Sequence, residues 1–252
     1  MSSPVVPNTE PAPSGAGLSE IERLTSIFYA PSRTFEDIKR SAMWIAPFLV
    51  LAVFSVIYIV TLDKKIGFEQ VVTNMQNNMP PADKERIESM PPEQRAAQDR
   101  GMRMGVKYTS YAFPIVSLIF AVIIATIFMA TMNFGFGAQV GFGAALAVVM
   151  YSWLPGIIRA IFGTIAIAAG SDPEAFNLEN PVATNPGFFI SPLDHPALFR
   201  FLSGFDVIQL WTLFLIGTGL AIVGGKKRSA GLACAFGWYF FILLIRTGWA
   251  AR

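Results

Sequence analysis

The sequence has little charge and almost none of the residues that build catalytic or metal centres. Of its 252 residues only 14% are charged, and it holds a single histidine, His195, and a single cysteine, Cys234. A single cysteine excludes a disulfide within the chain. One cysteine and one histidine are also too few for a Cys/His metal site. A Ser-His-Asp or Cys-His catalytic set is equally unsupported. The net charge of +2 is too small to indicate nucleic-acid binding. We therefore expect no enzymatic activity, no metal, no cofactor and no nucleic-acid partner.

The missing charge is explained by long apolar runs. A soluble domain carries about 25% charged residues, whereas this chain is 53% hydrophobic. A helix needs about 20 mainly apolar residues to cross a bilayer. The sequence therefore predicts an all-α fold, an integral membrane bundle of five transmembrane helices embedded in lipid. The expected spans are residues 43–62, 111–132, 140–169, 206–223 and 229–249.

The segments outside the spans differ in character. Residues 1–17 are rich in Pro, Ser and Gly and predict a disordered tail. Residues 18–42 predict short amphipathic or interfacial helices on the cytoplasmic side. Residues 63–110 form a polar loop, in which prolines at first helical positions predict two short helices, Pro81–Ser89 and Pro92–Arg103.

The first of the interfacial helices carries an apolar stripe at helical spacing. Its members are Leu18, Ile21, Leu24, Ile27 and Phe28. Such a helix either packs on the bundle or lies at the lipid headgroups, or it docks a partner protein. After Pro31 ends this helix, Thr34 is expected to cap the next one, with Asp37 as its capping-box partner.

The chain is expected to wrap around the third span, because that span contains a proline and a charge. Pro155 breaks the helical hydrogen bonding, and Arg159 would cost at least about 2.5–3.5 kcal/mol if it stood unpaired in the bilayer. Both must face other helices or enclosed water. Asp206, at the start of the fourth span, is the nearest carboxylate by topology. Either the two charges lock the helices together, or Arg159 reaches the membrane surface, or the residues line a polar site.

Small residues form one face of the fourth span: Gly217, Gly219 and Ala221. In lipid, such a face lets helix backbones approach closely. It indicates close packing within the bundle, and self-association is the second interpretation.

Three stretches together resemble the Yip-one domain family of Ypt-interacting multi-pass membrane proteins. One is the lead-in Pro31–Ile38, which is similar to that of bacterial members. The second runs from Gly141 to Pro155 and contains Tyr151, and the third runs from Asp206 through Trp211 to Gly219. The resemblance implies a five-helix bundle with a cytoplasmic N-terminus, and placement in a bacterial cytoplasmic membrane. The short basic turn Lys226–Arg228 favours the same orientation.

Eukaryotic members of that family bind Rab-type GTPases and act in traffic between the endoplasmic reticulum and the Golgi. This chain has no long acidic and aromatic segment before its first span and no Asp-Leu-Tyr-Gly-Pro string. The resemblance therefore does not carry GTPase binding over to it. The leading expectation is a non-enzymatic adaptor or organiser that contacts a membrane or cytoplasmic protein. The alternative is a small-solute permease whose polar site comprises Tyr151, Pro155, Arg159 and Asp206.

Overall fold

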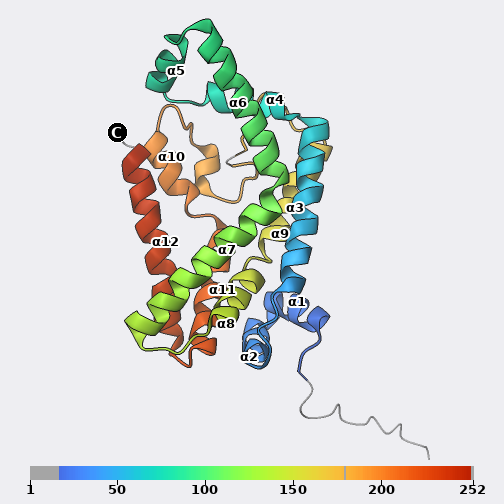
Figure 1. The fold of residues 1–252 in the computed structure, drawn as a ribbon, viewed down its shortest axis with the longest axis vertical. Coiled ribbons are helices and arrows are strands. Elements are labelled where there is room, and N and C mark those ends of the chain that lie inside the picture. The colour runs from blue at the N-terminus through green and yellow to red at the C-terminus, as the bar shows by residue number, and fades with distance from the viewer. Residues whose placement is uncertain (1–16, 179, 251–252) are drawn as a thin grey trace, which may run out of the picture.

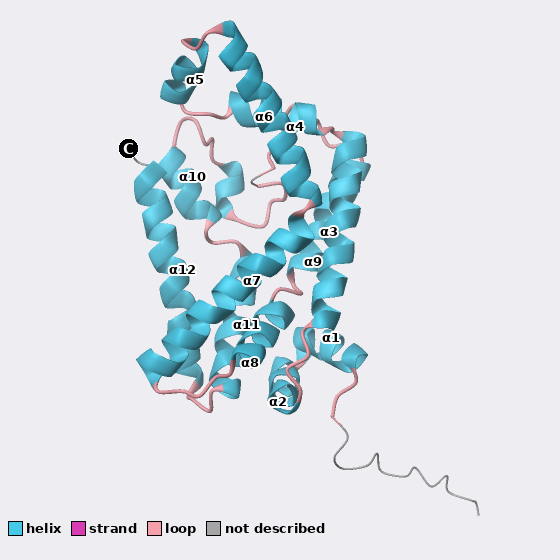
Figure 2. Ribbon diagram, in the orientation of Figure 1, coloured by secondary structure: helices cyan, strands magenta, loops and turns pink. Residues whose placement is uncertain are grey.

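A computed structural model describes residues 17–178 and 180–250, and its regular elements are helices throughout (Figure 2). The expected tail, residues 1–17, lies outside the described residues except for Gly17. In chain order the helices are α1 (Glu20–Tyr29), α2 (Pro31–Arg40), α3 (Ile45–Lys65), α4 (Phe68–Asn77), α5 (Pro81–Glu88), α6 (Pro92–Tyr111), α7 (Phe113–Ala130), the π-helical η1 (Thr131–Gly135), α8 (Phe142–Ser152), α9 (Gly156–Ala168), the 3-10 helix η2 (Pro186–Phe189), α10 (Pro196–Ser203), α11 (Val207–Val223) and α12 (Arg228–Ala250).

Four helical stretches are long and apolar enough to cross a membrane. They are α3, α7 with η1, α8 with α9, and α12. A fifth span results if α10 and α11 are counted as one helix bent by 49°. The predicted all-α membrane bundle is therefore confirmed, with four spans or five.

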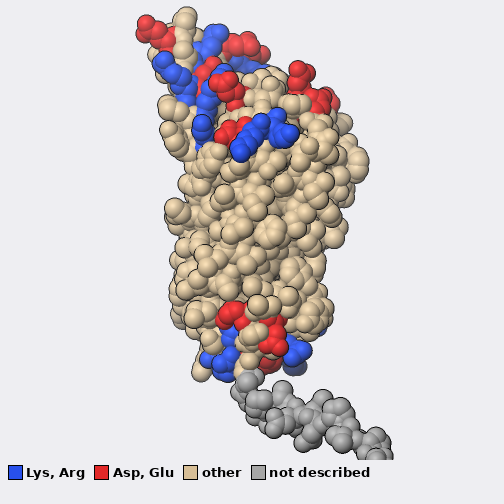
Figure 3. Space-filling view, turned by 90° about the vertical axis from the view of Figure 1, so that its right-hand side faces the viewer, with Lys and Arg blue, Asp and Glu red and all other residues tan. Residues whose placement is uncertain are grey.

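The helices run between two ends of an elongated bundle (Figure 1). The hairpin of α1 and α2 lies at one end, together with the α7–α8 and α11–α12 connections. Helices α4, α5 and α6 lie at the other end, with the end of α12. On the face shown in Figure 3, charged side chains gather at the two ends and an uncharged belt separates them. This is the distribution that a bilayer requires.

The third span is the centre of the bundle, as expected. In α8 every residue from Ala145 to Ser152 is buried. Over the whole span 56% of the apolar window is buried, against 17% for α3 and for α7 with η1, and 22% for α12. Helix α8 packs against α7, α11 and α2. Helices α3, α7 and α12 therefore present much of their surface to lipid, while α8 presents almost none and α11 is also largely buried.

The small-residue face of the fourth span packs against other helices of the same chain. A Cβ added at Gly219 would lie 2.7 Å from Val148 Cγ1, and one added at Gly217 would lie 2.8 Å from the Leu232 Cα. Helix α11 is thus held directly against α8 and α12 by residues that have no side chain. Close internal packing accounts for Gly217 and Gly219 and leaves neither available to a second copy.

Two local predictions need correction. Thr34 does not cap a helix: α2 begins at Pro31, and Thr34 is buried inside it. Proline at a first helical position is the stronger signal, because it has no N–H to satisfy. In the polar loop, α6 continues past Arg103 to Tyr111, and α4 precedes the two expected helices.

Candidate functional site

The third span breaks at Trp153–Pro155, and this break divides the predicted polar residues into two groups. Leu154 N–H donates to the Tyr151 carbonyl at 3.2 Å, and Gly156 N–H donates to the Trp153 carbonyl at 2.9 Å. These bonds to the third preceding residue carry the chain across the position where Pro155 has no N–H. Tyr151 lies before the break and Arg159 after it, so the two side chains serve different clusters.

The first cluster joins α9 to the start of α11. Arg159 Nη2 lies 2.5 Å from Asp206 Oδ1, so the structure shows the ion pair that was one of the alternatives left open by the sequence. Asp206 caps α11 by accepting from Gln209 N–H at 2.9 Å. The Asp206 side chain is 8% exposed and that of Arg159 is 37% exposed. The pair is half-buried, and the Asp206 carboxylate also lies where a helix N-terminus stabilises negative charge.

Thr184 completes this cluster and was not predicted. Its hydroxyl donates to Asp206 Oδ2, and its carbonyl accepts from Val207 N–H at 3.1 Å. Asn180 and Asn185 fix the loop on either side of it through reciprocal amide hydrogen bonds of 3.1 and 2.8 Å. A threonine in a polar loop gives no sequence signal for this contact, because the contact depends on where the loop folds.

The second cluster joins the α1–α2 hairpin to α8. The Tyr151 hydroxyl donates to Glu20 Oε2 at 2.9 Å. Arg23, which is 1% exposed, lies 2.5 Å from Asp37 and 3.4 Å from Glu20. The hydroxyls of Ser26 and Thr34 are 2.6 Å apart, which closes the hairpin further along.

In this second cluster, Arg23 and Asp37 stabilise each other's ionised form. Burial alone would raise the pKa of Asp37, but hydrogen bonds from Arg40 and Arg23 outweigh it and hold that pKa below its ordinary value. Burial likewise disfavours the charged form of Arg23, yet its hydrogen bond with Asp37 raises the Arg23 pKa. Both side chains are therefore ionised at neutral pH and form a buried pair. Arg23 lies outside the apolar stripe of α1, and a charged residue in that position gives no sequence indication of burial.

The apolar stripe of α1 faces in two directions. Ile27 is buried in the core and Leu24 packs against that core. Phe28 is partly exposed and meets Trp211 of α11 edge-on, with ring centroids 5.9 Å apart. Ile21 is 75% exposed, and Leu18 is half-buried. One side of the helix is thus anchored to the bundle while Ile21 points outward.

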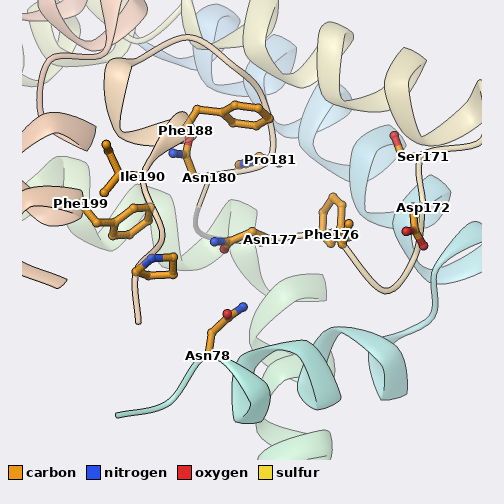
Figure 4. A pocket seen from close by; sticks show the side chains of 12 residues that line it. Asn78, Ser171, Asp172, Phe176, Asn177, Asn180, Pro181, Phe188, Ile190 and Phe199 are labelled. Carbon is orange, nitrogen blue, oxygen red and sulfur yellow. The ribbon is translucent and has the colours of Figure 1, made fainter. Parts of the chain in front are cut away.

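A cavity of about 410 Å³ lies at the opposite end of the bundle from the hairpin, and Figure 4 shows the side chains that line it. It is bordered by the loop after α9, by Asn78 directly after α4, and by Phe199 of α10. Its lining mixes aromatic rings with amides and one carboxylate, including Phe176, Phe188, Phe199, Asn78, Asn180 and Asp172. Asn180 also belongs to the loop that carries Thr184. The same loop therefore lines the cavity and contacts the Arg159–Asp206 pair.

Neither cluster has the composition of a metal site: among residues 17–178 and 180–250 there is no group of three His, Cys, Asp or Glu side chains that could hold an ion. Comparison with protein families matches residues 25–247 to the Yip1 domain. No curated protein and no solved structure matches the chain.

Proposed function

This chain is a multi-pass membrane protein that belongs to the Yip1 domain family, and we propose that it is a non-enzymatic adaptor that holds a protein partner at the membrane. The observation that supports this proposal is the anchoring of the α1–α2 hairpin. Tyr151 bonds the hairpin to the third span, and the buried Arg23–Asp37 pair holds α1 against α2, while Ile21 and Tyr29 stay 75% and 71% exposed. An exposed apolar patch on a fixed support is typical of an interaction surface.

The hairpin end faces the cytoplasm in this proposal. That end carries Lys226, Lys227 and Arg228 in a short turn between α11 and α12. Positively charged short loops remain on the cytoplasmic side during insertion. The partner is therefore a cytoplasmic protein, or a membrane protein with a cytoplasmic surface.

Photo-cross-linking in intact cells tests the adaptor function. A photoreactive amino acid is placed at Ile21, and in a matched control at Met104, which is 53% exposed on α6 at the other end. We expect a protein adduct of defined mass from position 21 and none from position 104. Adducts with lipid alone at position 21, or the same protein adducts from both positions, would overturn the proposal.

A permease is the second candidate, and one observation favours it. The buried Nε of Arg159 has no hydrogen-bond partner among the described residues, which leaves a donor beside a break in a span, where transporters bind substrates. Flux of small anions and amino acids into proteoliposomes tests this function. Transport that is present in the parent protein and in Arg159→Lys but lost in Arg159→Leu would establish it, whereas no flux by the parent protein would reject it.

A further inference from the structure

The turn between α11 and α12 borders a hollow that no part of the proposed function uses. The hollow has a volume of about 480 Å³ and is lined by Phe136, Lys226, Lys227, Ser229, Ala230 and Ala233. Two segments distant in sequence form it, the end of the α7–η1 span and the start of α12. Its lining combines two lysines with mainly apolar surface.

The two lysines that line the hollow have no carboxylate partner among the described residues. At the same end of the bundle, Arg23, Lys39 and Arg40 are each neutralised by an ion pair. Lys226 and Lys227 form none. Arg228, beside them, lies over the ring of Phe214 at 5.6 Å and also has no acidic partner. The turn is therefore a concentrated, uncompensated positive charge.

The backbone keeps this charge in place. Gly225 has a φ of +61°, and Lys226 N–H donates back to the Ala221 carbonyl at 2.9 Å, which ends α11 in a tight turn. Lys226 Nζ lies 3.8 Å from the position that a Cβ on Gly137 would occupy. Its ammonium group is thus placed against the neighbouring α7–α8 connection, and Lys226 also lines the hollow.

We propose that this hollow binds an anionic phospholipid, with the phosphate at Lys226 and Lys227 and the start of an acyl chain against Phe136, Ala230 and Ala233. Charge complementarity identifies the headgroup, because basic groups close to the ends of transmembrane helices attract anionic lipids. The apolar wall identifies a lipid as the source of the phosphate. A free phosphate ion would gain nothing from alanine and phenylalanine side chains, whereas an acyl chain is removed from water by them.

Lipid retention by the purified full-length protein tests this site. Delipidated protein in mild detergent is titrated with dioleoyl phosphatidylglycerol or dioleoyl phosphatidylcholine, and bound lipid is counted by native mass spectrometry. We expect one phosphatidylglycerol to bind tightly and phosphatidylcholine to show no comparable site. The double variant Lys226→Gln/Lys227→Gln should bind phosphatidylglycerol about 25-fold more weakly, from about 1 kcal/mol for each basic residue near an anionic surface.

Two further variants separate a built site from general attraction. Lys64→Gln/Lys65→Gln removes the same charge from two exposed, adjacent lysines that do not line this hollow, and it should leave binding unchanged. Ala233→Phe keeps every charge but fills the hollow, and it should weaken binding as strongly as the lysine variant. Ala233 is exposed, so this change leaves the core intact and decides the matter if the lysine variant does not fold.

Three results would overturn the proposal. One is equal loss of binding in the Lys64/Lys65 variant, which would mean that total charge alone attracts the lipid. Another is equal retention of the two lipids. The third is displacement of phosphatidylglycerol by millimolar inorganic phosphate, which would identify a free anion as the ligand.

Discussion

The hydroxyl of Tyr151 and the carboxylate of Glu20 are 131 residues apart in sequence and 2.9 Å apart in the structure. Their hydrogen bond joins the centre of the third span to the first turn of α1. Beside it, Arg23 and Asp37 form a buried pair between α1 and α2. The hairpin is therefore held by apolar anchors such as Ile27 and by a few polar contacts, and the polar contacts can be removed singly.

Tyr151→Phe keeps the buried ring and removes only the hydroxyl. We expect the hairpin to open more often, because a hydrogen bond to a charged group contributes about 1.5–3 kcal/mol. Hydrogen–deuterium exchange of Glu20–Tyr29 in detergent should become about tenfold faster or more. Tyr111→Phe is the matched control, since Tyr111 also bonds a carboxylate, Asp63, at 2.7 Å, but at the opposite end. Equal acceleration of α1 in the two variants would show that the contact of Tyr151 is not specific.

Removing one member of the Arg23–Asp37 pair should be more damaging than removing both. Arg23→Leu alone leaves the buried Asp37 with Arg40, at 3.0 Å, as its remaining charged partner, and Asp37→Leu leaves the buried Arg23 with only Glu20, at 3.4 Å. Breaking a buried ion pair from one side typically destabilises by about 3–5 kcal/mol. Arg23→Leu/Asp37→Leu leaves an apolar contact, and part of the lost stability should return. Limited proteolysis of the hairpin at pH 7 measures this order. If the effects of the two single substitutions on the cleavage rate were simply additive in the double variant, that result would contradict this order.

Lowering the pH should release the same hairpin only in strong acid. Because folding depresses the pKa of Asp37, the carboxylate stabilises the hairpin fully above its ordinary value of 3.8. That contribution is lost as the pH falls through the lower, folded pKa. Cleavage by pepsin between residues 18 and 40 should rise below pH 3.8 in the parent protein. Arg23→Leu/Asp37→Leu should lack this step, and a step near pH 6 in the parent protein would be inconsistent with Asp37 as its source.

The ion pair at the other cluster should respond asymmetrically. Asp206→Ala removes the cap of α11, which costs about 1 kcal/mol on average, and it also leaves Arg159 unpaired. Arg159→Leu leaves the cap intact, because Thr184 and the Gln209 N–H still donate to Asp206. The midpoint of thermal unfolding in detergent should therefore fall further for Asp206→Ala than for Arg159→Leu. The reverse order would show that Asp206 depends on Arg159 more than on the helix start.

The sequence was sufficient to predict features that depend on a stretch of apolar residues or on the physical requirements of a single residue. Apolar length predicts the spans, and a proline without an N–H predicts the break at Pro155. An arginine within an apolar span demands a partner, which is how Arg159 leads to Asp206. Each of these inferences needs only the residue and its surroundings.

The contacts that were missed depend on tertiary arrangement. Thr184 reaches Asp206 only because the Asn180–Asn185 amide pair shapes the loop. Arg23 is buried only because α2 folds back along α1, and a charged residue in an amphipathic helix otherwise predicts an exposed face. Thr34 illustrates a conflict between two local signals, in which proline at the first helical position prevailed over a capping-box pattern.

Cysteine labelling should decide which end of the bundle faces the cytoplasm. The only native cysteine, Cys234, is buried, and Cys234→Ala provides a background without reactive thiols. In that background, Lys227→Cys and Glu85→Cys place exposed thiols at opposite ends. In sealed membrane vesicles with the cytoplasmic side outward, an impermeant maleimide should label position 227 at once and position 85 only after detergent is added. The opposite pattern would invert the bundle, and the docking surface around Ile21 would then face away from the cytoplasm, where a cytoplasmic partner could not reach it.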